Sequence, residues 1–302
     1  MISLPPSGAR AKESEPKLRQ ADNESVATDP TGGSPSISSR LGGRGRVGRG
    51  LFPKVDDGTG SAAGARGPYA SLAVAIAIIA AVFVTQAVVI VGYSQALMRL
   101  DGTTPDIAAL PTDGLLLSLA TLASTAVAGG ALLLATTAGS RCRELGLRRP
   151  AVKSLLLGAA GLIGLALAFA AIAAALGRPA PPELVAKTVR NAGSLPLLAF
   201  AVVVAAPLWE ELLFRGLLYD GLRRSRSGAW PAVVLPAALW AGIHLQYEPL
   251  YVGFILLLGV YLGVLRHCTG STVVCIAVHA LNNLAGLALA YGGAAETLAQ
   301  RT

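Results

Sequence analysis

The stretch PLWEELLFRGLL, residues 207–218, decides how this sequence folds, because it places three ionisable residues inside a long apolar run. Ionised side chains at the centre of a membrane-spanning helix cost roughly 2.5 to 3.5 kcal/mol each on insertion scales, so they require partners. The three ionisable residues are Glu210, Glu211 and Arg215. The other strongly polar side chains in later apolar runs are His244, His279 and Asn283. We therefore expect these side chains to meet in one place.

The composition around this stretch is that of a polytopic membrane protein. Of the 302 residues, 53% are hydrophobic and only 14% are charged, whereas soluble domains carry about 25% charged residues. The net charge of +8 is typical of basic cytoplasmic loops and makes nucleic acid an unlikely partner. The three cysteines have no CxxC spacing, so we predict neither a disulfide framework nor a thiolate zinc site.

Seven apolar runs predict an all-α fold, a polytopic transmembrane helical bundle. A spanning helix needs about 20 apolar residues, and the fifth and sixth runs are short. Before the first run, residues 1–68 are polar and rich in Gly, Ser, Pro and Arg, which predicts a disordered tail. Small residues in the third run, such as Gly158, Gly161 and Gly164, suit close helix packing. The runs cover about 69–93, 114–137, 154–177, 195–219, 230–246, 249–265 and 271–291.

Basic residues indicate the orientation of this bundle. With seven spans, the tail and the basic loops all fall on one side, so the positive-inside rule predicts a cytoplasmic N-terminus and a C-terminus outside. The segment 178–191 departs from this bias and is a candidate for an interfacial helix. A chain this rich in Ala, Gly and Arg is typical of bacteria, which favours the bacterial plasma membrane. The basic loop residues are Arg141, Arg143, Arg148, Arg149, Lys153, Arg223, Arg224, Arg226 and Arg266.

Depth and spacing suggest how the polar residues are arranged. Glu210, His244 and His279 lie roughly 12 to 21 Å from the cytoplasmic ends of their predicted helices, at 1.5 Å per residue. Glu211 and Arg215 are four residues apart and share a helix face, so each can neutralise the other. Glu210 then points about 100° away from Glu211, which leaves it free to face the two histidines and Asn283. Pro207 and Pro236 can kink their helices and admit water.

These residue types allow two kinds of hydrolytic chemistry. A carboxylate beside a histidine can deprotonate a water, while a second histidine and an amide stabilise an oxyanion. Alternatively, Glu210, His244 and His279 could bind a divalent metal such as zinc, with Asn283 as a further ligand. No serine or cysteine occupies a convincing nucleophile position, and HExxH is absent, which excludes a soluble-type zincin on motif grounds.

Three motifs resemble those of the CPBP family, the CAAX-protease and bacteriocin-processing intramembrane enzymes. The family motifs are EExxxR, FxxxH and HxxxN, and here they read Glu210 to Arg215, Trp240 to His244 and His279 to Asn283. The first and third match fully, whereas Trp240 replaces the Phe of the second. The resemblance covers about residues 141–292 and leaves out the tail and the first two helices.

The resemblance implies an endopeptidase with particular residue roles. Glu210 is the expected water-activating base with His244 assisting, His279 and Asn283 are expected transition-state stabilisers, and Glu211 with Arg215 gives structural support. Whether a metal is bound stays open. The implied partners are the lipid bilayer and a membrane-associated peptide or protein substrate.

The implied organisation is a tail at 1–68, two accessory transmembrane helices at 69–140, a catalytic domain at 141–292 and a short tail at 293–302. Two other functions stay open at this point. The protein could be a catalytically silent immunity or scaffold protein that keeps the family fold. It could also be an ion- or proton-coupled transporter, because buried Glu, Arg and His also form proton pathways. A transporter should show a matching polar cluster in its first half, and the first three apolar runs contain none.

Overall fold

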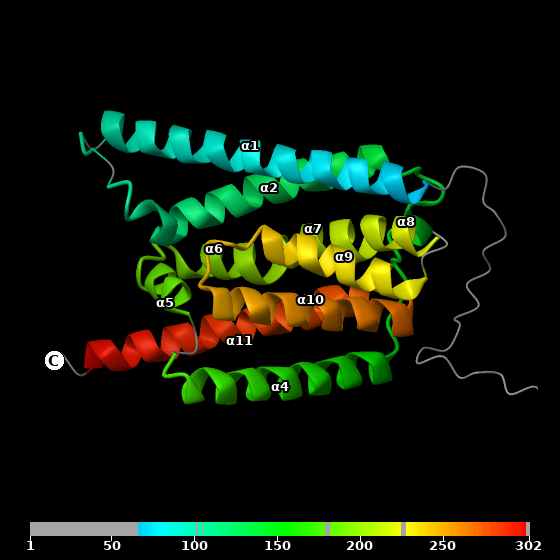
Figure 1. Ribbon diagram of the computed structural model, residues 1–302. Coiled ribbons are helices and arrows are strands. Elements are labelled where there is room, and N and C mark those ends of the chain that lie inside the picture. The colour runs from blue at the N-terminus through cyan, green and yellow to red at the C-terminus, as the bar shows by residue number, and fades with distance from the viewer. Residues whose placement is uncertain (1–65, 101, 105, 179–181, 225–227, 300–302) are drawn as a thin grey trace, which may run out of the picture. The chain divides into compact units, whose positions relative to one another are not determined.

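A computed structural model describes residues 66–100, 102–104, 106–178, 182–224 and 228–299, with side chains described up to residue 293. Within these ranges the regular elements are all helices, which confirms the all-α prediction (Figure 1). The predicted tail lies outside the described residues up to residue 65, as does Arg226 of the predicted basic loops.

Six helices are long and apolar enough to cross a membrane, instead of the seven that we predicted. They are α1 (Pro68–Leu100), α2 (Gly114–Ala135), α4 (Val152–Ala175), a composite helix (Leu195–Arg223), α10 (Pro249–Thr269) and α11 (Thr272–Ala299). The length of α11 also differs from the prediction, because the helix continues past residue 291. Shorter elements connect them: η1 (Leu110–Thr112), α3 (Arg141–Glu144) and α5 (Glu183–Arg190).

The predicted span that falls short is the fifth, about 230–246, which forms the short helix α9, Ala229–Gly242. Its 14 residues extend about 21 Å, which is less than the roughly 30 Å of a bilayer core. α10 cannot begin before Pro249, because Glu248 precedes this proline and is extended, with φ −61° and ψ 152°, as residues before proline prefer. Residues 243–248 therefore form a non-helical connection, and His244 lies in it and not within a helix as predicted.

α9 packs closely along α10 through glycines of α10. A Cβ on Gly259 would lie 3.0 Å from the Cβ of Ala237, and a Cβ on Gly263 would lie 2.9 Å from Cγ1 of Val233. The missing side chains thus let the two helices approach each other. This close packing supports α9 although the helix is too short to span the membrane by itself.

The composite helix changes its hydrogen-bond pattern twice along its length. It runs through α6 (Leu195–Ala199), the π-helix η2 (Phe200–Ala205), α7 (Ala206–Glu211), the π-helix η3 (Leu212–Leu218) and α8 (Tyr219–Arg223). The N–H of Ala206 donates to the carbonyl of Ala201, and the N–H of Tyr219 donates to the carbonyl of Phe214, each five residues earlier. The sequence predicted a kink at Pro207 but not these π segments, which occur frequently at functional sites.

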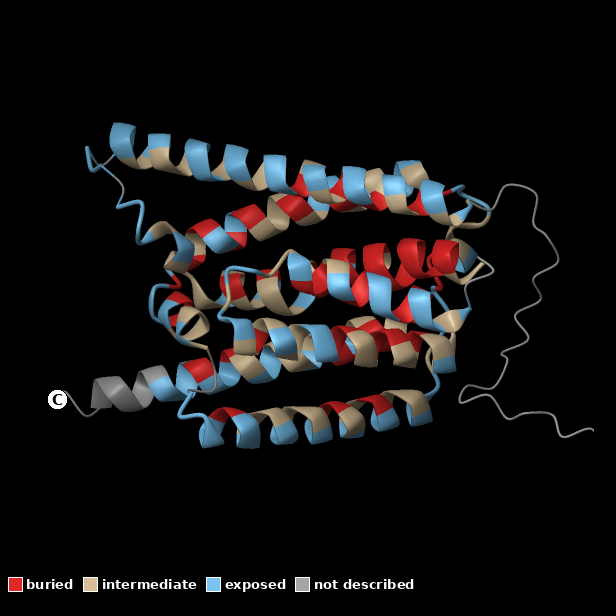
Figure 2. Ribbon diagram, in the orientation of Figure 1, coloured by how far each residue is buried: buried red, intermediate tan, exposed pale blue. Residues whose placement is uncertain are grey.

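The composite helix lies in the interior of the helical bundle, between a layer of α1 and α2 and a layer that contains α10, α11 and α4 (Figure 1). Of the 18 residues that form its most apolar stretch, 50% are buried, whereas only 11% are buried in the corresponding stretch of α4. Figure 2 shows the buried residues concentrated on α7 and α8. The apolar surface of the outer helices fits a lipid bilayer, and we conclude that the protein is membrane-embedded.

The predicted basic loops gather at one end of the bundle. Thr272, at the start of α11, donates through its hydroxyl to the carbonyl of Leu145, and the Ser271 hydroxyl donates to the carbonyl of Arg148. Arg66, before α1, lies 3.8 Å from Glu144. These contacts join the start of α1, the 136–151 connection and the α10–α11 turn. Which membrane face this end occupies stays a prediction.

Arg266 differs from its predicted position in a loop. It lies in the last turn of α10 and is only 6% exposed. Its Nε donates to the carbonyl of Arg215 at 2.9 Å, and its guanidinium lies 5.0 Å from the centre of the Tyr219 ring. Gly146 permits this packing, because a Cβ there would lie 2.3 Å from the guanidinium. Arg266 thus fastens α10 to the composite helix.

The candidate interfacial segment contains α5, a helix of eight residues that packs against α11. Its Val189 belongs to a small apolar cluster with Leu198 of the composite helix and Leu287 of α11. Arg190 and Glu183 form an ion pair at 2.9 Å on its exposed face. The segment is therefore a short amphipathic helix. Its position at the interface stays a prediction.

Candidate active site

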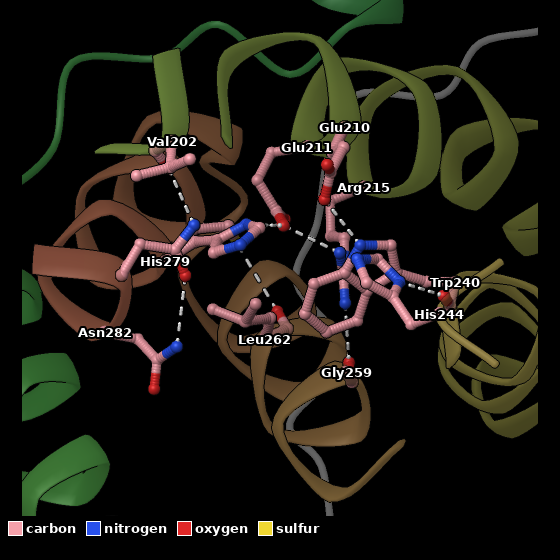
Figure 3. A network of polar contacts seen from close by, with 12 residues as sticks. Val202, Glu210, Glu211, Arg215, Trp240, His244, Gly259, Leu262, His279 and Asn282 are labelled. Carbon is pink, nitrogen blue, oxygen red and sulfur yellow. Dashed lines mark hydrogen bonds and ion pairs between the residues drawn. The ribbon is translucent and has the colours of Figure 1, made fainter. Parts of the chain in front are cut away.

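Glu211 and Arg215 form a fully buried ion pair along the composite helix, as their spacing predicted. Nη1 of Arg215 donates to Oε1 of Glu211 at 2.7 Å, and the side chains are 1% and 0% exposed (Figure 3). Nη2 of Arg215 donates to the carbonyl of Gly259 at 3.1 Å. The guanidinium also lies 4.8 Å from the centre of the Trp240 ring. The cation therefore has partners from the composite helix, α9 and α10, which lowers the cost of its burial.

His279 of α11 binds to the same carboxylate oxygen. Its Nδ1 lies 2.9 Å from Oε1 of Glu211, and both side chains are buried. The carboxylate, ionised beside Arg215, can only accept a hydrogen bond, so Nδ1 of His279 is the donor. The second oxygen, Oε2 of Glu211, is buried without a hydrogen-bond partner. Glu211 therefore connects Arg215 to α11 through one oxygen atom.

Glu210 points to a different helix and has a different partner. Nε1 of Trp240 on α9 donates to Oε2 of Glu210 at 2.6 Å, and the glutamate is 7% exposed. That Glu210 faces the two histidines and Asn283 stays a prediction. Its described hydrogen bond goes to α9, because adjacent residues of α7 point in different directions. The two adjacent glutamates thus serve separate hydrogen-bond networks.

Trp240 connects these two networks. Its ring centre lies 5.3 Å from that of His244 and 5.0 Å from that of His279, in T-shaped contacts. Its backbone carbonyl lies 2.7 Å from Nδ1 of His244. Because a carbonyl can only accept, Nδ1 of His244 carries the hydrogen, and the neutral ring then has Nε2 as an acceptor.

Tyr247 is a candidate that the sequence analysis missed. Its ring stacks on His244 at 6.3 Å between centres, and its N–H donates to the carbonyl of His244 at 3.1 Å. Burial raises the pKa of the Tyr247 phenol above its ordinary value, and the negative charge of Glu210 raises this pKa further. Tyr247 therefore lies within electrostatic reach of Glu210. Only its position three residues after His244 could have indicated it.

Asn283 lies one turn beyond His279 on α11 but does not bind Glu210. Its Nδ2 donates to the carbonyl of Val202 at 2.8 Å, and its Oδ1 accepts from Nδ2 of Asn282 at 3.1 Å. The HxxxN motif therefore contacts the composite helix at two points, through His279 at Glu211 and through Asn283 at Val202.

The proposed metal ligands do not form a metal-binding group. In the part of the chain that the structure describes, no three His, Cys, Asp or Glu side chains lie close enough together to hold a metal ion. Glu210 binds the indole of Trp240, and His279 uses Nδ1 for Glu211. The arrangement of Glu210, His244 and His279 thus does not fit a shared metal, and we derive no step of the chemistry through one.

The three motifs have a counterpart among known proteins. Residues 192–285 match the model of a family described as Type II CAAX prenyl endopeptidase Rce1-like. This part of the chain is similar to CAAX prenyl endopeptidases. No curated protein matches the chain, and no solved structure does.

The family match confirms the resemblance that the three motifs indicated. It spans the composite helix, α9, α10 and the motif-bearing part of α11, and it therefore includes every residue of the candidate site. α1, α2 and α4 lie outside the match. The match shows that this part of the chain is similar to CAAX-type endopeptidases, and the apolar helices indicate a membrane-embedded protein. It does not assign a catalytic residue or a mechanism.

Proposed function

We propose that the protein is an intramembrane endopeptidase in which Glu210 activates water, with His244 assisting, to hydrolyse a peptide bond. One observation supports this proposal: the two adjacent glutamates have different kinds of partners. Arg215 and His279 both bind Glu211, whereas Glu210 binds only the neutral indole of Trp240 among its described hydrogen-bond partners. Glu210 therefore has no neighbouring cation that competes for its negative charge in this network.

The proposed reaction begins when the Glu210 carboxylate takes a proton from a water molecule. The water oxygen attacks the carbonyl carbon of the substrate, and the carbonyl oxygen becomes an oxyanion. When this intermediate collapses, the C–N bond breaks and the proton on Glu210 passes to the leaving amine. The acceptor Nε2 of His244 can hold the second hydrogen of the attacking water and orient its lone pair.

His279 and Asn283 complete the proposed site. Glu211 holds the ring of His279 beside Trp240, so the imidazole is positioned before the reaction starts. Preorganised polar groups of this kind stabilise developing charge because they need no rearrangement during the reaction. Glu211 and Arg215 act as structural support, and Asn283 anchors α11 to the composite helix.

The proposed substrate is a membrane-associated peptide or protein. The family match favours a C-terminal CAAX sequence, although the site residues described above carry no feature specific to a prenyl group. Within this proposal, residues 141–292 form the catalytic domain, and α1 and α2 are accessory helices. We also propose that the protein lies in a bacterial plasma membrane with its N-terminus in the cytoplasm, as the basic loops favour.

The test is cleavage by the purified full-length protein of a fluorogenic CAAX peptide, prepared with and without a farnesyl group. We expect the wild-type protein to cleave and Glu210→Gln to lose more than about 99% of the turnover, because a general base contributes roughly 10²- to 10⁴-fold. The matched control is Glu248→Gln, which changes an exposed glutamate whose described partner is Arg178.

Three outcomes have distinct meanings. Undiminished cleavage by the Glu210→Gln variant would reject Glu210 as the base. Absence of cleavage by a folded wild-type protein with both peptides would support the silent immunity or scaffold protein instead. A preference for the farnesylated peptide would assign the prenyl substrate class that the family match implies.

A further inference from the structure

The proline before the reactive glutamate leaves a backbone carbonyl without its usual partner. In η2, the N–H of Ala206 donates to the carbonyl of Ala201, five residues earlier. The next bond in this register would run from residue 207 to the carbonyl of Val202. Residue 207 is proline, which has no N–H to donate. The π-helical register and Pro207 together therefore leave the Val202 carbonyl without a backbone donor in this register.

Asn283 supplies the missing donor from another helix. Its Nδ2 lies 2.8 Å from the carbonyl oxygen of Val202. Because that oxygen can only accept, the orientation of the Asn283 amide is determined, and Asn282 supports it by donating to Oδ1 at 3.1 Å. Pro207 is buried and Val202 is half-buried, and a buried carbonyl without a partner is costly, most of all in a membrane.

We propose that Asn283 is a positioning residue whose side-chain amide substitutes for the missing N–H of Pro207. By binding Val202 it holds the junction between η2 and α7, and α7 carries Glu210 three residues after the proline. α11 therefore contacts the composite helix on both sides of Pro207. Asn283 binds Val202 before the proline, and His279 binds Glu211 after it. This role differs from the oxyanion stabilisation that the family resemblance implies for Asn283.

A double-mutant cycle tests whether the Asn283 amide takes the place of the missing Pro207 N–H. The variants are Asn283→Ala, Pro207→Ala and the double variant, each as full-length protein in detergent micelles. Asn283→Ala should lower kcat by about tenfold or more with KM changed less than about twofold, because the carboxylate is displaced while the substrate site is intact. Its thermal midpoint should fall by roughly 2 to 4 °C. Adding Pro207→Ala restores an N–H for Val202, so the double variant should recover most of both losses.

Asn282→Ala is the matched control, because it removes the same side-chain type from the adjacent position. It removes the supporting bond to Oδ1 but keeps Nδ2 of Asn283, the donor to Val202. Adding Pro207→Ala to Asn282→Ala should bring no recovery. If Asn283→Ala with Pro207→Ala is as impaired as Asn283→Ala alone in both kcat and thermal midpoint, the Asn283 amide does not replace the missing N–H and the proposal is wrong. If it regains its thermal midpoint but not its kcat, Asn283 acts on the reacting atoms and is not a positioning residue.

The activity readout rests on the proposed function, but the thermal readout does not. If the wild-type protein proves inactive, recovery of the thermal midpoint still shows that the Asn283 amide replaces the N–H of Pro207, and additive losses still reject it. If Asn283→Ala alone does not fold, the folding of the double variant answers the same question.

Discussion

The composite helix and α4 are both apolar enough to span a membrane, yet they occupy opposite environments. The composite helix carries Glu210, Glu211 and Arg215 and is 50% buried over its most apolar window, whereas α4 is 11% buried. α4 has no ionisable residue after Lys153. Its exposed apolar side chains can face lipid without cost. The comparison shows that polar residues determine which helix must lie inside the bundle.

The two helices also differ in how regular they are. α4 is a continuous α-helix over 24 residues, whereas the composite helix contains two π segments and a proline. Irregular backbone at membrane depth is tolerated only where other groups satisfy it. Asn283 satisfies Val202, and Arg266 satisfies the carbonyl of Arg215. The irregular helix is therefore possible only because the other helices surround it.

The largest expected effect comes from breaking the buried ion pair. Arg215→Ala leaves the buried Glu211 without its cation and should destabilise the protein by about 3–5 kcal/mol. The control is Arg178→Ala, just beyond the end of α4, where an exposed pair with Glu248 at 2.9 Å is lost, and which should cost at most about 1 kcal/mol. Chemical unfolding in micelles measures both. Equal losses would contradict the contrast between the buried and the exposed pair.

The next effect concerns the glycines of α4. A Cβ on Gly161 would lie 2.4 Å from the hydroxyl of Tyr261, which donates to the carbonyl of Gly158, whereas a Cβ on Gly164 meets open space. Gly161→Ala should therefore cost about 1–3 kcal/mol through overpacking. Gly164→Ala should stabilise by up to about 1 kcal/mol through helix propensity. Thermal unfolding of the two variants would contradict this if their order were reversed.

Trp240→Phe tests the hydrogen bond that holds Glu210. The variant keeps an aromatic ring but removes the indole N–H that binds Oε2 at 2.6 Å. Hydrogen bonds to charged groups contribute about 1.5–3 kcal/mol, so we expect kcat to fall about tenfold or more while KM is unchanged. Trp230→Phe, at a position 48% exposed, is the control. A rise in kcat would contradict this prediction, because it would mean that the hydrogen bond from the indole holds Glu210 in a position that slows the reaction.

The smallest expected effect is that of Tyr247→Phe, which removes a hydroxyl near Glu210. We expect kcat to fall at most about fivefold, because the hydroxyl influences Glu210 only electrostatically and the ring contact with His244 is kept. Because burial and Glu210 raise the pKa of Tyr247, its phenol stays protonated through neutral pH and up to about pH 10. The ratio of wild-type to variant rates should therefore be constant between pH 6 and pH 9. A ratio that falls steeply towards pH 9 would contradict this, and Tyr291→Phe, at an exposed position, is the control.

Much of the candidate site could be predicted from local spacing. Glu211 and Arg215 are four residues apart, so their ion pair follows from helix geometry alone. The small residues of α4 were only partly informative, because Gly158 and Gly161 contact other helices and Gly164 does not. The sequence has no direct signal for this difference, because it depends on which face of α4 meets α10 and α11.

The sequence by itself determined that this is an all-helical membrane protein with a few polar residues that must converge, because charges in apolar runs require partners. Only the tertiary structure decided which partner each residue has. Glu210 binds Trp240 and His279 binds Glu211 because the helices have particular rotations about their axes, which no spacing within one helix reveals. The π segments of the composite helix likewise depend on donors from α10 and α11. Residues 207–218 therefore depend on the neighbouring helices in two ways. These helices keep the segment buried, and they give Glu210 and Glu211 different hydrogen-bond partners.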